Sequence, residues 1–338
     1  MTEEEIVKVL KKGEIVAIPT DTVYGLVVVP VKNTVQKLYT LKNREKDKPF
    51  GVFISNEESL RPLLSVDFKE IENATSFWPG ALTLVLPVKR DVYPFLQKNS
   101  KIGFRMPDYP LLLKIMDKTG PLVQTSANIT SESVPETWEE VRSIFGDEVF
   151  VVKGKAGNLS STVLEYKGEY WHALRKGSIP LAKLREKIHV KTDMFNVIFL
   201  CTGNTERSPM AEAIAKSLFK GLPVNIESRG ILPGERPYSE IAQRVVQKMG
   251  YESIIGKSQM IGYDDLFWAD LVLVMERRHI EFLKENFPMF GDKIYMLSDE
   301  DIPDPVGLGE KSHELVFRII EMEIKQRWFE FIKSFVDI

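Results

Sequence analysis

The stretch CTGNTERSP, residues 201–209, decides the fold of the C-terminal part of this chain. Its cysteine, Cys201, directly follows the apolar run 197–200 and precedes Arg207 by six positions. An apolar strand that leads a cysteine into a tight loop before a helix over 209–219 places the sulfur over a helix N-terminus. Unpaired N–H groups and the helix dipole favour anions there. The pattern predicts a phosphate-binding loop in which the cysteine acts as a thiolate nucleophile.

The neighbours of the cysteine strengthen this interpretation. Arg207 supplies a cation and a planar fork for two phosphate oxygens. Gly203 and Asn204 can adopt positive φ angles that turn backbone N–H groups inward as an anion nest, and Ser208 can donate a hydrogen bond to the thiolate. An isolated cysteine at a strand end is more often a small buried core residue. The spacing instead favours a catalytic role for Cys201 and its three polar neighbours.

Residues 201–219, CTGNTERSPMAEAIAKSLF, resemble the low-molecular-weight protein-tyrosine phosphatase family, whose loop reads CxGNxxRSPxAE. The resemblance covers 195–338 and includes the stretches 228–238 and 269–280. The family uses the aspartate of an Asp-Pro loop as general acid, which implies this role for Asp304, although an Asp-Pro pair alone indicates only a turn. The resemblance implies a phosphatase that acts on a phosphoprotein and needs no cofactor.

Two positions of the loop depart from the usual family pattern. Glu206 stands where the family usually has a second cysteine, so the chain has no resolving thiol, and the carboxylate could oppose the substrate's negative charge. Thr205 resembles the protein-arginine phosphatase branch, where the hydroxyl would complement a guanidinium. Val306 and Gly307 follow the Asp-Pro pair where tyrosine-specific members usually have aromatic residues. The resemblance favours phosphoarginine over phosphotyrosine; alternatively, Thr205 only packs or caps the loop.

Length and composition indicate a second domain and exclude several classes of protein. A chain of 338 residues fits two domains of ordinary size. The composition, 43% hydrophobic and 28% charged with a net charge of −3, is that of a globular protein whose main task is not coating nucleic acid. No apolar run approaches the roughly 20 residues of a membrane span, and the acidic N-terminus is unlike a signal peptide. The single cysteine excludes intrachain disulfides and suits a reducing cytoplasm, where we expect the protein to reside without a membrane segment.

The N-terminal half has the pattern of an α/β domain. A helix over 3–12 ends at Gly13, and a short strand over 15–18 runs into PTDTVYGL, residues 19–26. The other expected elements are a helix over 35–41 and strands over 51–54, 82–87 and 122–124. The helix is followed by the basic cluster KNREKDKPF and the last strand runs into TSAN. Taken singly, the cluster indicates a solvated helix end and TSAN a turn.

Together these pieces resemble the YrdC/Sua5 family of threonylcarbamoyl-AMP synthases. PTDTVYGL, the K-x-R of Lys42 and Arg44 followed by KPF, WPGALTLVLP, GFRMP, TSAN, STVLE and LRKGSI occur in the family's order and span nearly all of residues 1–180. The resemblance implies that L-threonine, bicarbonate and ATP give threonylcarbamoyl-AMP and pyrophosphate, the first step of the t6A modification of tRNA position 37. Longer members carry their own C-terminal domain and a closing linker, where this chain has the stretch that resembles a phosphatase.

The resemblance also implies two groups of site residues. The threonine pocket would contain Thr20, Arg105, Thr125 and Ser161. The ATP site would contain Lys42, Arg44, Lys48, Ser126, Asn128 and Arg175. Mg²⁺ is expected to accompany the triphosphate, and no protein-bound metal site is predicted. The expected chemistry is carbamate formation on the threonine amine followed by attack on the α-phosphorus, so the protein would act by positioning and charge stabilisation.

The sequence therefore predicts a bifunctional α/β protein. A YrdC-like domain with a twisted open α/β sheet is expected over 1–185, a linker over 186–194, and a Rossmann-like phosphatase domain with a central parallel sheet over 195–338. The implied partners are a phosphoprotein, the t6A-transferase complex and tRNA or another RNA. Two alternatives stay open: the N-terminal half could be a non-catalytic RNA-binding module, or Glu206 could have disabled the phosphatase so that its domain serves as a lid or docking surface.

Overall fold

The computed structural model describes residues 1–337 and divides the chain into two compact units. The first unit comprises Met1–Ile179 and Lys187–His189. The second comprises Pro180–Glu186 and Val190–Ile338. Within the charged stretch 181–194 the chain forms the short helix α6 (Leu181–Leu184) and the short strand β10 (Val190–Lys191).

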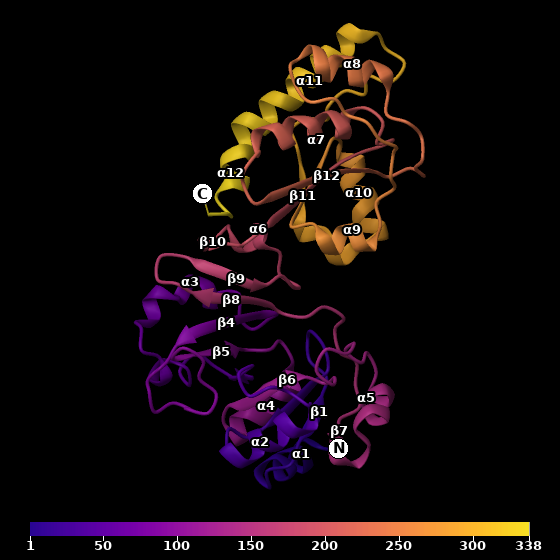
Figure 1. Ribbon diagram of the computed structural model, residues 1–338. Helices are drawn as coiled ribbons and strands as arrows, with labels where there is room; N and C mark the ends of the chain where they lie inside the picture. The colour runs from indigo at the N-terminus through magenta and orange to yellow at the C-terminus, as the bar shows by residue number, and fades with distance from the viewer. Residues whose placement is uncertain (338) are drawn as a thin grey trace. The chain divides into compact units, whose positions relative to one another are not determined.

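A mixed sheet forms the centre of the first unit (Figure 1). Its strands are β1 (Val16–Ile18), β2 (Gly25–Val28), β3 (Gly51–Phe53), β4 (Leu82–Pro87), β5 (Lys101–Arg105), β6 (Leu122–Ser126), β7 (Phe150–Val151), β8 (Thr162–Tyr166) and β9 (Trp171–Arg175). The strands lie in the order β9-β8-β4-β5-β3-β6-β2-β1-β7. The pairs β1–β7, β3–β5 and β4–β8 are parallel, and the other neighbours are antiparallel.

Helices cover this sheet through apolar faces. They are α1 (Glu3–Lys11), α2 (Lys32–Leu41), α3 (Glu72–Thr75), α4 (Pro110–Thr119) and α5 (Trp138–Phe145). Helix α1 begins where the Thr2 and Glu5 side chains cap each other's backbone N–H groups. Buried residues of α1 and α4 pack with residues of β1, β2, β3 and β6 in one core cluster. Helix α2 begins three residues before the predicted start, and in its first turn the Thr34 hydroxyl donates to the carbonyls of Val29 and Val31.

Strand pairing brings distant motifs of the first unit together. In the β2–β6 register Gly25 lies opposite Ser126 and Leu26 opposite Thr125, so PTDTVYGL and TSAN are neighbours. In the β3–β5 register Phe53 lies opposite Arg105. The polar residues of these motifs therefore gather at strand ends around one region of the sheet.

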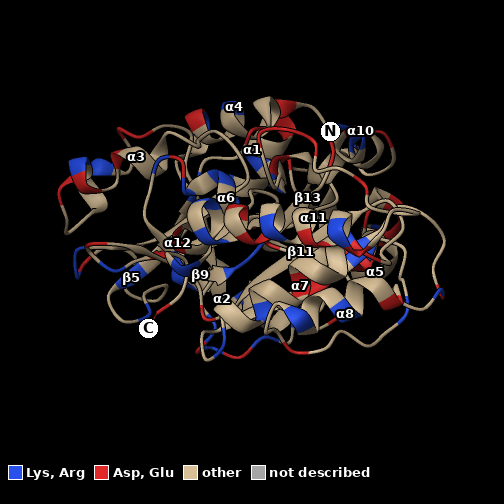
Figure 2. Ribbon diagram, turned by 90° about the horizontal axis from the view of Figure 1, so that it is seen from above, with Lys and Arg blue, Asp and Glu red and all other residues tan. Residues whose placement is uncertain are grey.

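The second unit is built on an all-parallel sheet in the order β12-β11-β13-β14. Its strands are β11 (Phe195–Cys201), β12 (Val224–Gly230), β13 (Leu271–Val274) and β14 (Ile294–Met296). The α-helices that follow β11 are α7 (Arg207–Leu218), α8 (Glu240–Lys248), α9 (Tyr263–Trp268), α10 (Arg277–Asn286), α11 (Glu310–Glu323) and α12 (Phe329–Lys333). Figure 1 shows α7 and α11 on one side of the sheet and α9 and α10 on the other. Helix α11 carries both acidic and basic residues along its length (Figure 2).

The carboxyl ends of these parallel strands position the cysteine loop. Cys201 ends β11 opposite Gly230, the last residue of β12. Loops that follow neighbouring parallel strands meet at the same edge of a sheet, where ligands bind in such folds. The predicted α/β fold, with two domains and a parallel sheet in the C-terminal part, is confirmed. Helix α7 begins at Arg207, two residues before the predicted helix.

Candidate active sites

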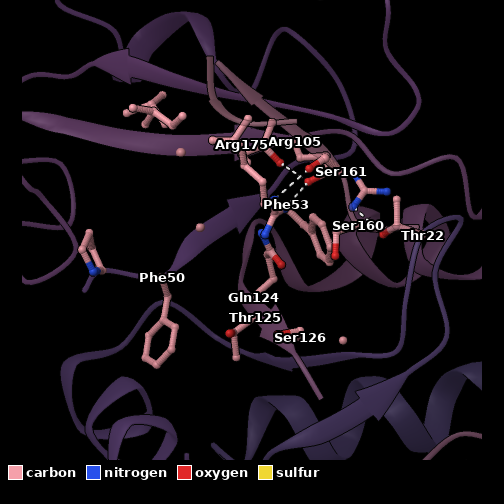
Figure 3. Close-up of a pocket in the computed structure, with 18 of the residues that line it drawn as sticks. Thr22, Phe50, Phe53, Arg105, Gln124, Thr125, Ser126, Ser160, Ser161 and Arg175 are labelled. Carbon is pink, nitrogen blue, oxygen red and sulfur yellow. Dashed lines mark hydrogen bonds between the residues drawn. The ribbon is translucent and has the colours of Figure 1, made fainter. Parts of the chain in front are cut away.

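A cavity of about 520 Å³ opens among the strand ends of the first unit. Most of the residues predicted for the synthase line it: Thr20, Arg44, Arg105, Thr125, Ser126, Ser161 and Arg175. Figure 3 shows Arg105, Ser160, Ser161 and Arg175 grouped together, with Gln124, Thr125 and Ser126 below them. The cavity joins the residues predicted for threonine to several of those predicted for ATP.

Arg105 is held inside the PTDT turn by three polar partners. Its Nη1 donates to Thr22 Oγ1 at 2.7 Å, its Nη2 pairs with Asp21 Oδ1 at 2.5 Å, and its Nε donates to the Gly80 carbonyl at 3.0 Å. The Arg105 side chain is only 4% exposed. Thr20 Oγ1 lies 3.0 Å from Thr22 Oγ1, so the hydroxyls of the turn are fixed by the same network. Because Arg105 is buried and bonded to these partners, it holds the threonine-rich wall of the cavity in a fixed conformation.

Ser161 and Arg175 meet on another wall of the cavity. Arg175 donates from Nε to the Ser161 carbonyl and from Nη2 to Ser161 Oγ, both at 2.9 Å. Ser161 Oγ also lies 2.9 Å from Thr83 Oγ1 on the neighbouring strand. The two bonds from one guanidinium orient it across the cavity, where it adds positive charge (Figure 3).

Lys42 and Asn128 do not line the cavity but lie behind its TSAN wall. Lys42 is 1% exposed, and its Nζ donates to the Ser126 carbonyl at 2.5 Å, to the Asn128 carbonyl, and to Asn128 Oδ1 at 3.2 Å. Asn128 Oδ1 also accepts from Ser126 Oγ at 2.6 Å. Burial, together with the charge of Arg44, lowers the pKa of Lys42 to about 7. Lys42 and Asn128 therefore shape the turn that presents Ser126.

Arg44 and Lys48 also differ in their placement. Arg44 lines the cavity above the Phe50 ring, and its Nε donates to the Lys48 carbonyl at 2.8 Å. The Lys48 side chain is 51% exposed and its Nζ pairs with Glu45 at 2.7 Å, outside the residues that line the cavity. Of this basic cluster, Arg44 is the residue that faces the cavity.

Sequence reasoning missed several residues that line the cavity: Thr22, Lys98, Asn99, Lys101, Gln124 and Ser160. Lys98 and Lys101 flank a tight turn in which Asn99 and Ser100 have φ angles of 52° and 58°. An Asn-Ser pair between two lysines is a detectable turn signal, since asparagine tolerates the left-handed region. Lys98, Arg44 and Arg175 add positive charge to one part of the cavity, which suits a polyphosphate. Lys101 instead pairs with Glu165 at 2.8 Å, and Glu165 also lines the cavity.

The loop between β11 and α7 folds around the cysteine sulfur. Cys201 is 2% exposed, and its Sγ accepts the Asn204 backbone N–H at 3.2 Å and lies 3.0 Å from Ser208 Oγ. Asn204 has a φ of 50°, which turns its N–H toward the sulfur. Backbone and hydroxyl donors thus surround the position where thiolate charge develops.

The Asn204 side chain braces this loop. Its Nδ2 donates to Ser208 Oγ at 3.0 Å and to Ser228 Oγ at 2.9 Å, and its Oδ1 accepts from the Gln259 N–H at 2.8 Å. Asn204 is fully buried. It therefore fixes the left-handed turn from inside and holds Ser208 beside the sulfur.

Arg207 is buried and bonded on both sides of its guanidinium. Nη1 donates to Glu276 Oε1 at 2.6 Å and to the Ile302 carbonyl at 2.8 Å, whereas Nη2 pairs with Asp304 Oδ2 at 2.7 Å. Burial raises the pKa of Glu276, but hydrogen bonds from Arg278 and Arg207 outweigh it and hold that pKa below its ordinary value. An ionised Glu276 locks the guanidinium next to the cysteine loop, and Asp304 lies at the same guanidinium.

His279 and Thr202 were not predicted and lie directly behind the site. His279 is fully buried, its Nε2 lies 3.0 Å from Thr202 Oγ1, and its Nδ1 has no hydrogen-bond partner among the described residues. Burial lowers the pKa of His279 to about 4, so the ring is neutral near pH 7. Thr202 Oγ1 also accepts from Arg278 at 2.9 Å. The sequence carries no local signal that pairs residues so far apart.

Thr205 lies at the edge of the loop next to another arginine. Its carbonyl accepts the Ser239 N–H at 2.9 Å. A Cβ atom placed on Gly203 would lie 3.4 Å from both Thr205 Oγ1 and Arg236 Nη2, so the two side chains converge there. Thr205 is thus available to contact a group bound beside the loop, with a positive charge close by.

Within residues 1–337 no group of three or more His, Cys, Asp or Glu side chains is placed to hold a metal ion. Over the same residues, no helix combines the length and apolar character needed to cross a bilayer.

Comparisons with known proteins give separate matches for the two parts of the chain. The Sua5/YciO/YrdC family model, described as "Telomere recombination", matches residues 8–177. The model described as "Low molecular weight phosphotyrosine protein phosphatase" matches residues 196–335. The threonylcarbamoyl-AMP synthase of Neisseria gonorrhoeae is 35% identical over 171 residues, which cover 49% of this chain and 90% of that protein.

Two solved structures are also similar to parts or all of the chain. P. abyssi Sua5 complexed with L-threonine is 22% identical, with a TM-score of 0.52 and coverage of 94% of this chain and 93% of that one. The YwlE arginine phosphatase from Geobacillus stearothermophilus is 30% identical, with a TM-score of 0.39 and coverage of 41% of this chain and 94% of that one. The family models and the relatives in sequence show that the chain belongs to the Sua5/YciO/YrdC family and joins a domain of the threonylcarbamoyl-AMP synthase type to a low-molecular-weight protein phosphatase domain.

Proposed function

We propose that the first unit makes threonylcarbamoyl-AMP and pyrophosphate from L-threonine, bicarbonate and ATP, for the t6A modification of tRNA position 37. The observation that carries this proposal is the cavity of about 520 Å³ that joins a hydroxyl-rich wall to a cationic one. A volume of a few hundred Å³ or more is that of a small-molecule site. The cavity therefore suits an amino acid beside a nucleotide.

The two walls of the cavity are assigned to different substrates, one to threonine and the other to ATP. Thr20, Arg105, Thr125 and Ser161 form the threonine pocket, with Arg105 acting through its bonds to Asp21 and Thr22. Arg44, Ser126 and Arg175 contact ATP, and Lys42 and Asn128 support Ser126 from behind. Mg²⁺ enters as the MgATP substrate, coordinated by phosphate oxygens. Lys48 lies at the surface of the same loop and is not assigned a contact with ATP.

The synthase reaction needs positioning more than a covalent nucleophile. The threonine amine adds to bicarbonate with loss of water, giving a carbamate. A carbamate oxygen then attacks the α-phosphorus, and pyrophosphate leaves with the electron pair of the broken P–O bond. Cationic side chains such as Arg44 and Arg175 offset the charge that develops on the leaving group. The product is the substrate of the t6A-transferase complex, which makes that complex a partner.

We propose that the second unit hydrolyses a phosphorylated protein side chain, with phosphoarginine preferred to phosphotyrosine. The Cys201 thiolate attacks phosphorus, Arg207 binds equatorial oxygens, and Asp304 gives a proton to the leaving group. Water then attacks the cysteinyl phosphate and releases inorganic phosphate. The bonds from Asn204 and Ser208 to the sulfur support the nucleophile, and Thr205 supports recognition of a guanidinium.

One experiment on the full chain tests both activities. The wild type and Cys201→Ser are each incubated with threonine, bicarbonate and MgATP while pyrophosphate is measured, and separately with para-nitrophenyl phosphate. We expect threonine-dependent pyrophosphate from both proteins and phosphate release only from the wild type. Pyrophosphate that forms without threonine would refute the synthase assignment. Absence of ATP binding together with retained RNA binding would instead support an RNA-binding module.

A further inference from the structure

Glu206 and His313 form a buried ion pair that the proposed chemistry does not use. Glu206 Oε2 lies 2.7 Å from His313 Nε2, and the two side chains are 12% and 1% exposed. Glu206 immediately precedes Arg207 at the start of α7, whereas His313 lies in the first turn of α11. The contact therefore joins residues 107 positions apart in the sequence and links the cysteine loop to helix α11.

Both ring nitrogens of His313 have oxygen partners. Nε2 faces the Glu206 carboxylate, and Nδ1 lies 3.2 Å from the Gly309 carbonyl. A backbone carbonyl only accepts, so Nδ1 carries a proton, and the bond to Glu206 then shares a second proton between carboxylate and ring. Glu310, the charged neighbour on the same helix, is engaged by Lys248 at 3.0 Å. The pair is thus a specific bridge with both ends of the imidazole occupied.

The far end of this bridge is the segment that carries the general acid. Gly309 is the residue on which α11 begins, five positions after Asp304. Between them the chain turns at Gly307, which has a φ of 75°, and the Leu308 N–H donates to the Pro305 carbonyl at 2.9 Å. Asp304 Oδ1 accepts from the Val306 N–H of this turn at 3.2 Å, and Asp304 Oδ2 pairs with Arg207. Gly309 is held by His313 and by the helix itself, since its carbonyl also accepts the Ser312 N–H at 3.0 Å, and this limits where Asp304 can move.

We infer that Glu206 and His313 are positioning residues for Asp304, rather than a carboxylate that opposes the substrate. This inference rests on the phosphatase activity proposed above. The Glu206 carboxylate is paired with His313, so its negative charge is offset there instead of standing unpaired beside the anion site. Through Gly309 the pair anchors the segment from which Asp304 reaches the leaving group.

Leaving-group dependence distinguishes this role from ordinary structural support. Phenyl phosphate releases a basic phenolate and needs the proton from Asp304, whereas para-nitrophenyl phosphate releases an acidic phenol and needs it much less. A misplaced general acid lowers turnover of phenyl phosphate selectively. A loss of folded protein lowers turnover of both esters equally.

The test compares full-length Glu206→Gln and His313→Gln with the wild type on both esters. Glu206→Gln is nearly isosteric and keeps an acceptor oxygen, so it remains informative if His313→Gln unfolds. Glu314→Gln is the matched control, since Glu314 lies on α11 but pairs with Lys248. We expect kcat on phenyl phosphate to fall roughly tenfold more than kcat on para-nitrophenyl phosphate in the pair variants. In an Asp304→Asn background the same substitutions should leave this ratio unchanged.

Equal losses on both esters, or a ratio that moves equally in Glu314→Gln, would overturn the positioning role. An additional change of the ratio in the Asp304→Asn background would overturn it as well, because the pair would then act without Asp304. A wild type inactive on both esters would refute the phosphatase proposal itself, and with it the reaction that the pair serves.

Discussion

Arg207 Nη2 lies 2.7 Å from Asp304 Oδ2, so the two charged residues of the phosphatase site bind each other directly. The Arg207 side chain is 2% exposed, whereas that of Asp304 is 37% exposed. Because Nη2 carries N–H groups suited to a phosphate oxygen, an anion at the loop must compete with Asp304 for the guanidinium. Phosphate binding and proton donation therefore depend on the same contact.

Asp304→Asn should separate these two effects. The amide keeps the size of the side chain but removes the competing charge, so inorganic phosphate should bind about threefold to tenfold more tightly; solvent screening at a partly exposed residue limits the gain. Turnover of phenyl phosphate should fall by about a hundredfold or more, since the general acid is lost. Calorimetry with phosphate and steady-state kinetics measure the two quantities. Weaker phosphate binding in the variant would contradict the competition.

Arg44→Ala and Lys48→Ala should differ although both residues lie in the same basic loop. Arg44 lines the cavity, whereas the Lys48 ammonium pairs with Glu45 at the surface. Losing charge-assisted bonds to a triphosphate costs on the order of 1.5 to 3 kcal/mol, so Arg44→Ala should weaken ATP binding roughly tenfold or more. Lys48→Ala should change the Kd by less than about twofold.

Titration calorimetry with MgATP measures both affinities, and circular dichroism checks that both variants are folded. A loss in Lys48→Ala equal to that in Arg44→Ala would mean that the triphosphate extends beyond the cavity. Unchanged affinity in Arg44→Ala would remove Arg44 from the ATP site.

Local sequence signals predicted the cysteine loop well because its geometry is local. An apolar strand, a residue able to adopt a left-handed φ at Asn204 and a following helix bring Cys201, Asn204 and Ser208 together within eight residues. The motifs of the first unit are weak local signals taken singly and were assigned through the family resemblance. The β2–β6 pairing that makes the end of PTDTVYGL and TSAN neighbours joins segments far apart in the sequence. In both cases the polar residues follow directly from strand ends.

The partners that orient these residues could not be predicted, because they come from distant elements. Glu276 reaches Arg207 across 69 residues, and His279 reaches Thr202 across 77. Lys42 was expected to face ATP, but a helix pattern fixes only where α2 ends and not where the following side chain points. Its ammonium finds three oxygens behind the TSAN turn, and this tertiary contact determines its direction.

Thr205→Ile should shift substrate preference from phosphoarginine toward phosphotyrosine. The substitution removes a polar contact for a guanidinium and adds apolar surface suited to a phenol ring. A site that pairs with a polar group discriminates strongly when the pairing is lost, whereas an apolar change is worth only about 1 to 3 kcal/mol. The loss should therefore fall mainly on phosphoarginine turnover, measured as the ratio of kcat/KM on the two substrates.

Arg236→Gln is the control for charge beside Thr205. Arg236 converges with Thr205 at Gly203, and its positive charge opposes a guanidinium there. Removing that charge should raise phosphoarginine turnover without improving phosphotyrosine turnover. A wild type that already prefers phosphotyrosine, or a ratio unmoved by Thr205→Ile, would defeat the assignment.

Lys42 should make the stability of the first unit depend on pH in a defined direction. Burial lowers its pKa to about 7 in the folded protein, from the ordinary value of 10.5. Between these values the unfolded chain binds more protons than the folded one, so the free energy of unfolding rises with pH. The stabilisation is fully present above the unfolded pKa and is lost as the pH falls through about 7.

Comparison of the wild type with Lys42→Met isolates this effect, because methionine has a similar length and does not titrate. Calorimetric unfolding of both full-length proteins from pH 6 to pH 9 gives their stability difference at each pH. As the pH rises above 7, the free energy of unfolding of the wild type should increase relative to that of Lys42→Met, by at most about 1.4 kcal/mol per pH unit. The three oxygens around Nζ act in the opposite direction, since each favours an N–H of the charged ammonium. A difference that stays constant over this range would show that these bonds, and not burial, determine the charge of Lys42.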